Sequence, residues 1–192
     1  MAQGNTDQEK RVTLRTLRKW VSESKRFAML TCYDATTASL FWQGGVKVML
    51  VGDSAGQVIL GHDSTIPAPM PFMLEITRAV RRGAPKALIM ADMPFGSYQC
   101  GDDEAMRNAV AFLKEADADW VKLEVDADDV ALVRRMARSG IPVVAHLGSR
   151  PQHYKSLGGY ASAGRQDWEV ELIVETAGMM VEAGVSGILL EA

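Results

Sequence analysis

Cysteine is scarce in this sequence, which has only Cys32 and Cys100 among its 192 residues. Two cysteines cannot build the disulfide framework of a small secreted domain, and these two lack the spacing of a metal site. We therefore expect a reducing, cytoplasmic location. An excess of positive charge is also missing, since the formal net charge is −3. This charge argues against nucleic acid as a partner, because domains that bind phosphate backbones are usually basic.

Long apolar runs are absent too. No run approaches the roughly 20 apolar residues that span a bilayer, so no membrane partner is expected. The polar N-terminus MAQGNTDQEKRVT has no apolar core of the signal-peptide type. We predict a flexible tail over residues 1–10, followed by a single domain over residues 11–192.

Six short apolar segments are predicted to be strands. Most are nearly continuous in apolar character, which is typical of strands covered on both faces in a parallel sheet. They cover residues 27–34, 46–54, 87–95, 119–125, 141–148 and 187–192.

Amphipathic segments alternate with these strands and are predicted to be helices, at residues 35–45, 73–83, 102–116, 126–140 and 167–184. Asp102 and Asp103 are expected to cap the third of them and to place negative charge in its first turn. A further helix over residues 13–24 is expected to cover the bottom of the sheet. Repeated β–α units predict parallel strands, in either a doubly wound sheet or a (β/α)8 barrel. The barrel is favoured, because no G-x-G-x-x-G motif follows the first strand and no P-loop is present.

Polar residues end nearly every predicted strand, and in a parallel barrel such ends converge on the face where active sites are built. Any one of them has an alternative role as a helix cap or loop hydrogen-bonder. Six polar strand ends in succession nevertheless favour a shared site. The residues are Asp34, Asp53, Ser54, Asp92, Lys122, Glu124, His146 and Glu191.

Three of these residues are acids with the hard oxygen atoms that suit Mg²⁺ or a similar cation, namely Asp53, Asp92 and Glu124. The alternative is that they cap helices. Lys122 leaves its strand on the same face as Glu124. It would hold a substrate carboxylate or keto oxygen, form a Schiff base, or simply pair with Glu124.

The remaining two candidates are His146 and Glu191. His146 is either a core histidine or a hydrogen-bonder to substrate, and its place near a strand end favours substrate. Glu191 would be the free carboxylate that removes a proton. The whole set indicates proton abstraction next to a carbonyl, with a metal stabilising the enolate.

A longer motif, VGDSAGQVILGHDSTIPAPM over residues 51–70, combines a glycine-containing turn with a proline-containing loop. This pattern is typical of an ordered active-site loop, in which we expect His62 to be structural.

Several motifs together resemble the ketopantoate hydroxymethyltransferase family. They are TCYDATTASL, VMLVGDSAG, LGHDSTIP, AVRRGAP, ADMPFGSY, WVKLE, PVVAHLG, PQ…GGY…GR and ILLEA. The resemblance runs from about residue 12 to the last residue. It implies a phosphoenolpyruvate/pyruvate-type barrel, usually decameric. The implied reaction transfers a hydroxymethyl group from 5,10-methylenetetrahydrofolate to 3-methyl-2-oxobutanoate, giving 2-dehydropantoate for pantothenate and coenzyme A.

The resemblance also implies roles for individual residues. Asp53, Asp92 and Glu124 match the metal positions. Asp53, Ser54, Asp92 and Lys122 match the 2-oxo-acid contacts. His146 matches a substrate-side histidine, and Glu191 matches the proton acceptor.

Some loops depart from the family pattern. Val125 and Asp126 follow VKLE where glycines are common, and Ser149 and Arg150 intervene before PQ. The loop GGYASAGR lacks the usual lysine. These changes are expected to affect substrate fit more than metal binding.

Length is the largest departure, because such barrels need about 250 residues. We expect a barrel truncated after the sixth strand, with unpaired edges on the first and sixth strands. Two alternatives to the transferase follow. One is an inactive remnant or an assembly partner of a full-length homologue. The other is a C–C lyase of the isocitrate lyase type, although the Lys-Lys-Cys-Gly-His loop of that family is absent.

Overall fold

A six-stranded parallel sheet organises the protein, whose computed structural model describes residues 10–192. All of the predicted tail except Lys10 lies outside the described residues. The strands follow one another in sequence order across the sheet, as in a barrel, whereas a doubly wound sheet reverses its order. They are β1 (Met29–Thr31), β2 (Val48–Val51), β3 (Leu88–Asp92), β4 (Trp120–Glu124), β5 (Val143–Gly148) and β6 (Gly187–Glu191).

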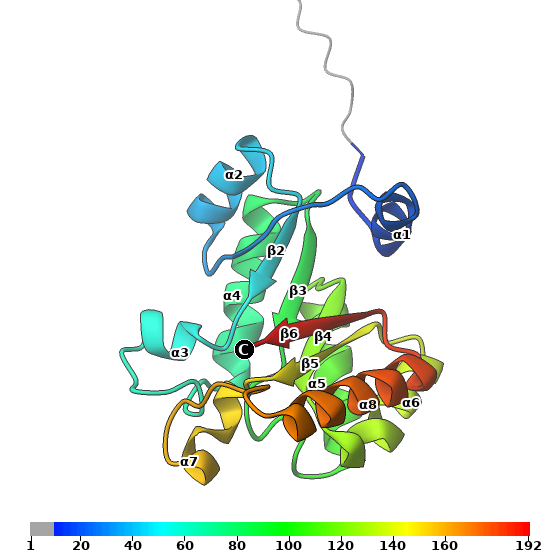
Figure 1. Ribbon diagram of the computed structural model, residues 1–192. Coiled ribbons are helices and arrows are strands. Elements are labelled where there is room, and N and C mark those ends of the chain that lie inside the picture. The colour runs from blue at the N-terminus through cyan, green and yellow to red at the C-terminus, as the bar shows by residue number, and fades with distance from the viewer. Residues whose placement is uncertain (1–9) are drawn as a thin grey trace, which may run out of the picture.

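The sheet curls but does not close (Figure 1). Among the described residues, β1 pairs only with β2, and β6 pairs only with β5. The predicted barrel type and its two open edges are therefore confirmed.

Helices follow each strand except the last, as predicted. The longer ones are α1 (Leu14–Ser22), α2 (Ala35–Gln43), α4 (Met70–Gly83), α5 (Asp102–Glu115), α6 (Val130–Arg138) and α8 (Asp167–Ala183). Three short elements in the loops were not predicted: α3 (Ala55–Val58), η2 (Pro151–His153) and α7 (Tyr154–Leu157). The helix predicted over residues 126–140 begins with a 3-10 turn, η1 (Ala127–Asp129), before α6. None of the helices over residues 10–192 is long and apolar enough to cross a membrane.

The predicted cap of α5 is wrong. Gly101, with a φ of 133°, occupies the cap position and makes no side-chain bond. Asp102 and Asp103 lie in the first turn, where, as expected, their negative charge stabilises the positive end of the helix dipole.

Two apolar clusters explain why the strands are apolar on both faces. The larger lies between the sheet and its outer helices and includes Ile89, Val121 and Phe112, all fully buried. The smaller packs the inner face of the sheet, including Leu88, against Leu17 of α1. The extra helix therefore covers one end of the inner face, as expected.

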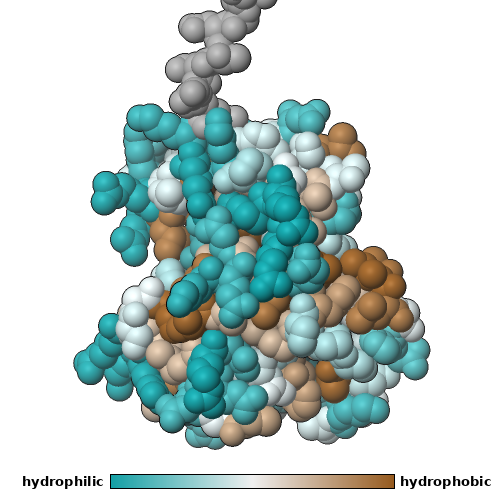
Figure 2. Space-filling view, turned by 180° about the vertical axis from the view of Figure 1, so that it is seen from behind, coloured by the Kyte–Doolittle hydropathy of each residue, from teal (hydrophilic) through white to brown (hydrophobic). Residues whose placement is uncertain are grey.

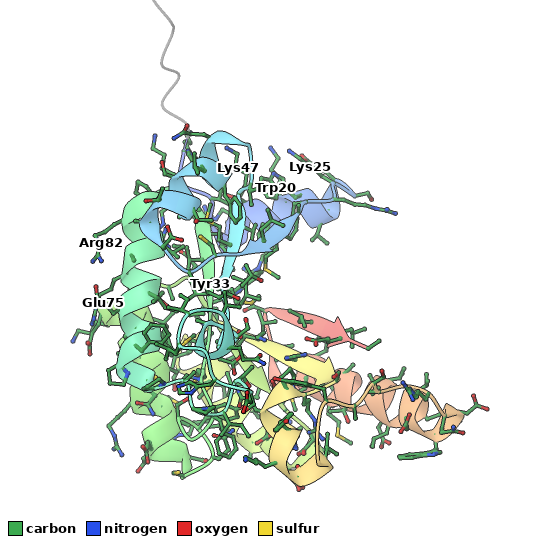
Figure 3. All side chains as sticks on the ribbon, turned by 90° about the vertical axis from the view of Figure 1, so that its left-hand side faces the viewer. Trp20, Lys25, Tyr33, Lys47, Glu75 and Arg82 are labelled. Carbon is green, nitrogen blue, oxygen red and sulfur yellow. The ribbon has the colours of Figure 1, made fainter. Side chains whose placement is uncertain are left out.

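Close packing of α2 against α4 depends on Gly83, the last residue of α4. A Cβ atom at Gly83 would overlap the backbone carbonyl of Ala35. The exposed side of α4 is instead charged: Arg82 bonds Glu75 at 3.0 Å, and both lie on the outer edge of the molecule in Figure 3.

Candidate active site

The strand register brings most of the predicted polar residues together at the carboxyl ends of the strands. Asp92 on β3 lies opposite Lys122 on β4. Glu124 on β4 lies opposite His146 on β5. Because alternate residues of a strand share a face, Lys122 and Glu124 point to the same side of the sheet.

Lys122 lies at the centre of this cluster. Its Nζ atom is 3.1 Å from Oδ1 of Asp92 and 3.3 Å from Nδ1 of His146. The other oxygen of Asp92 accepts a hydrogen bond of 3.1 Å from the backbone N–H of Asp53. Lys122, Asp92 and His146 are all buried, so one cation and its neighbours are removed from water together.

The three acids of the cluster are held in an environment that favours their neutral forms. Burial and the nearby Asp92 raise the pKa of Asp53 to about 7. Burial and the nearby Asp53 raise the pKa of Glu124 to about 8. The pKa of Asp92 is also raised, chiefly by burial. The site therefore holds more acid than its one lysine neutralises, which is the environment expected where a further cation binds.

Lys122 itself stays charged. Burial alone would lower its pKa, but the carboxylates of Asp92 and Asp53 outweigh that effect and raise it. A Schiff base requires the neutral amine, so this environment favours the charge-binding role over the Schiff-base alternative.

His146 is neutral, because burial and then the charges of Lys122 and Arg150 lower its pKa to about 3. The ammonium of Lys122 can only donate, so Nδ1 of His146 accepts and the ring proton is assigned to Nε2. Nε2 lies 3.4 Å from Oε2 of Glu191, without hydrogen-bond geometry. The histidine thus lies between the buried lysine and Glu191.

Glu191 is the last residue of β6, and its side chain is 50% exposed. Its backbone carbonyl accepts a 2.7 Å hydrogen bond from the N–H of Ser149. The expected proton acceptor therefore reaches the cluster from the open edge of the sheet.

Two strand-end residues are less closely tied to the cluster. Ser54 directly precedes α3, and its hydroxyl lies 2.9 Å from the hydroxyl of Tyr33, which is labelled in Figure 3. Asp34 caps α2 by accepting bonds of 2.8 Å and 2.7 Å from the backbone and side chain of Thr37. For Asp34, the helix-cap alternative is correct.

Sequence reasoning missed Gln152, which lies in η2 after β5 and is only 4% exposed. Its side chain donates to Asp53, and its backbone N–H donates to Glu124 at 3.0 Å. The one available signal was its place in the PQ motif, which says nothing about these contacts.

A divalent cation fits part of this donor set. Within residues 10–192, no group of three or more histidine, cysteine, aspartate or glutamate side chains is arranged to hold one ion. However, Mg²⁺ commonly takes one or two carboxylates and fills its other positions with water and substrate oxygens. Asp53 and Asp92 supply such a pair. Oδ1 of Asp92 is buried and forms an ion pair with the ammonium of Lys122 at 3.1 Å, without hydrogen-bond geometry.

The fold and the site define the class, an α/β-barrel protein with an acid-rich polar cluster at the carboxyl ends of its strands. The family model for ketopantoate hydroxymethyltransferase matches residues 11–192, and the chain belongs to that family.

Curated relatives agree with this family. The 3-methyl-2-oxobutanoate hydroxymethyltransferase of Pseudothermotoga lettingae is 49% identical over 173 residues, which is 90% of this chain and 65% of the relative. The protein of the same name from Syntrophus aciditrophicus is 46% identical over 182 residues, covering 95% and 67%. The chain thus spans about two thirds of the length of these relatives.

Solved structures share the fold at low sequence identity. A 2,3-dimethylmalate lyase of the PEP mutase/isocitrate lyase superfamily has a TM-score of 0.69 at 19% identity, covering 94% of this chain and 64% of its own. A phosphonopyruvate hydrolase solved with oxalate and Mg²⁺ has a TM-score of 0.71 at 14% identity, with the same coverage. At this level of identity the likeness establishes the barrel type only.

Proposed function

We propose that this protein transfers a hydroxymethyl group from 5,10-methylenetetrahydrofolate to 3-methyl-2-oxobutanoate, giving 2-dehydropantoate, at the cluster around Lys122. The observation that carries the proposal is the buried Asp53–Asp92–Lys122–His146 cluster, with a free carboxylate, Glu191, at its rim. The names of the curated relatives support the choice of substrates.

Lys122 binds the oxo acid in this proposal. Its ammonium has three N–H donors, and two of them face Asp92 and His146. The third is available for the carboxylate or keto oxygen of the substrate. Because the lysine is buried, this interaction would be stronger than the same contact in water.

Glu191 removes the proton from C3 of the oxo acid. It lies half-exposed at the rim of the site, where it is accessible to substrate, whereas burial disfavours the charged forms of Asp53 and Glu124. The Nε2–H of His146 lies beside it and would orient its carboxylate when substrate closes the site. The resulting C3 nucleophile forms a bond to the methylene carbon of the folate, and both C–N bonds of that carbon break. Water supplies the hydroxyl oxygen, and the C3 proton and one proton of the water go to the two nitrogens of the released tetrahydrofolate.

A Mg²⁺ or similar ion is the proposed cofactor, held by Asp53 and Asp92 directly and by Glu124 directly or through water. When bound, it would polarise the keto group and so acidify C3.

The family also suggests a homo-oligomer in the cytoplasm, which we include in the proposal. Exposed apolar side chains of α8 are consistent with association, since Val174 is 66% and Trp168 is 64% exposed.

Proton exchange tests the proposal directly. The chain, Mg²⁺ and 3-methyl-2-oxobutanoate are mixed in D₂O, and loss of the C3 proton signal is followed by NMR. Glu191→Gln should slow exchange by at least about 100-fold, the size of a general-base contribution. Oxo-acid binding should remain. Glu182→Gln, an exposed glutamate of α8, is the matched control and should exchange normally.

The outcomes separate the candidate functions. Unchanged exchange in Glu191→Gln would remove the role of Glu191. Exchange without folate-dependent product would limit this chain to the first half-reaction. If the chain showed no proton exchange and no oxo-acid binding, the result would favour an inactive remnant or an assembly partner.

A further inference from the structure

Gln152 connects the ends of four strands through one side chain and one backbone N–H. Its Nε2 atom donates to Oδ2 of Asp53 at 2.8 Å and to the carbonyl of Met93 at 3.0 Å. Its Oε1 atom accepts from the hydroxyl of Tyr98 at 2.7 Å and from Nε2 of Gln99 at 3.3 Å. Because the carbonyl of Met93, which faces Nε2, can only accept and both groups facing Oε1 can donate, the orientation of the amide is determined.

The side chain has no donor left for a substrate. A glutamine amide carries two N–H groups, and here Asp53 and Met93 take both. Gln152 therefore acts through Asp53, and its influence on chemistry is one of position.

We propose that Gln152 is the positioning residue that fixes the carboxylate of Asp53 in the orientation needed to bind a divalent cation. Gln152 holds one oxygen, Oδ2, so the carboxylate cannot rotate about its last bond. The backbone of Asp53 is held separately, by Asp92. The identity of the substrate that the bound cation would polarise rests on the proposed function, but the positioning of Asp53 by Gln152 does not.

The chemistry of the amide suits this task. An arginine or lysine at this place would also hold Asp53, but its charge would compete with the incoming cation. A neutral amide orients the carboxylate while leaving its negative charge for the ion. Tyr98 and Gln99 in turn hold the amide. The loop after β3 therefore supports the position of Asp53, which follows β2, through Gln152, which follows β5.

Cation affinity provides the test, with Mn²⁺ as the probe and its dissociation constant measured by electron paramagnetic resonance on the 192-residue chain. Gln152→Met keeps the length of the side chain but removes its donors, and we expect Mn²⁺ affinity to fall about 10- to 100-fold, as for other residues that orient metal ligands. The backbone bond from residue 152 to Glu124 is kept in this variant.

Asn108→Ala is the matched control. Asn108 is also a side-chain amide, and it supports the same loop by donating to the carbonyl of Ser97 at 2.7 Å, without touching the acids. If Gln152 merely stabilised the loop, both variants would weaken Mn²⁺ binding equally. The positioning role predicts that Asn108→Ala stays within about twofold of wild type, whereas Gln152→Met does not.

If Gln152→Met does not fold, Gln152→Asn replaces it, because its shorter amide cannot reach Asp53 and Met93 together. Wild-type Mn²⁺ affinity in a folded Gln152 variant overturns the proposal, as does a wild-type chain that binds no Mn²⁺. A chain that binds Mn²⁺ but exchanges no C3 proton contradicts the proposed function only. In that case a weakened Gln152 variant still supports the positioning role.

Discussion

The inner strands and the last strand of the sheet differ sharply in burial, although both contribute to the same site. Every residue of β3 and β4 is buried, whereas β6 and the adjoining α8 leave apolar side chains exposed, such as Leu190 at 66% and Val181 at 61%. Apolar patches also interrupt the hydrophilic surface in the rear view of the molecule (Figure 2).

Because of this difference in burial, some ionisable residues of the site lie away from water and others lie near solvent. Lys122 and Asp92 lie on the buried strands, where removal from water makes each depend on the other. Glu191 lies on the exposed strand, and its side chain is half open to solvent. The comparison implies that substitutions in the buried half affect folding, while substitutions at the rim affect chemistry alone.

Removing the buried cation should have the largest effect. Lys122→Met leaves the acids of the cluster without a counter-charge, and we expect the free energy of unfolding at pH 8 to fall by about 3–5 kcal/mol. Urea denaturation measures it. Lys114→Met, on the exposed side of α5, should change the value by less than about 0.5 kcal/mol. Equal losses in the two variants would contradict a special role for the buried lysine.

A pair of leucine-to-alanine substitutions compares the buried strand β4 with the exposed strand β6 without changing any charged group. Leu123 on β4 is fully buried and Leu190 on β6 is mostly exposed. Leu123→Ala should lower the free energy of unfolding by about 3 kcal/mol, and Leu190→Ala by less than about 1 kcal/mol. Similar losses would show that β6 is buried in solution, for instance by association.

Stability should fall as the pH rises from 6.5 to 8 in the absence of metal. The folded-state pKa values of Asp53, about 7, and Glu124, about 8, lie above those of the unfolded chain, so folding binds protons in this range. We expect a loss of about 2 kcal/mol in the free energy of unfolding. The lowered pKa of His146 acts in the opposite direction, but mainly below its unfolded value of 6.5.

Urea denaturation at the two pH values checks this dependence. Asp53→Asn should reduce the loss, because it removes one of the two groups that take up protons. Mg²⁺ should reduce it too, by stabilising the charged acids. A stability that is flat or rises with pH would contradict the raised pKa values.

The smallest effect on stability is expected at the rim. Glu191→Gln should change the free energy of unfolding by less than about 0.5 kcal/mol, because its half-exposed side chain makes no buried pair. Chemical denaturation of the same variant used for proton exchange measures this. A large loss would mean that slow exchange reports unfolding instead of a missing base.

The sequence was a good guide wherever side-chain position follows from strand periodicity. Continuous apolar segments predicted the six strands, and the polar residues at their ends gave Asp92, Lys122, Glu124 and His146 as neighbours. Parallel strands in sequence order leave these residues little freedom to be anywhere else.

Sequence reasoning failed where position depends on the path of a loop. Gln152 reaches Asp53 only because the chain turns back over the strand ends after β5, and no periodicity encodes that turn. Asp34 shows the converse, since it ends a strand like the others yet faces Thr37 and caps a helix. The cap of α5 was misplaced for a similar reason, because Gly101 adopts a φ that only glycine favours.

The end of β5 sets the position of Glu191 through backbone contacts. Gly148 has a φ of 92° and lies opposite Glu191 in the register, and a Cβ atom there would overlap the carbonyl of Glu191. The place of Glu191 in the site therefore depends on the residue at position 148. A related sequence with any other residue in place of Gly148 could retain the glutamate, but the backbone that carries it would be displaced from the site.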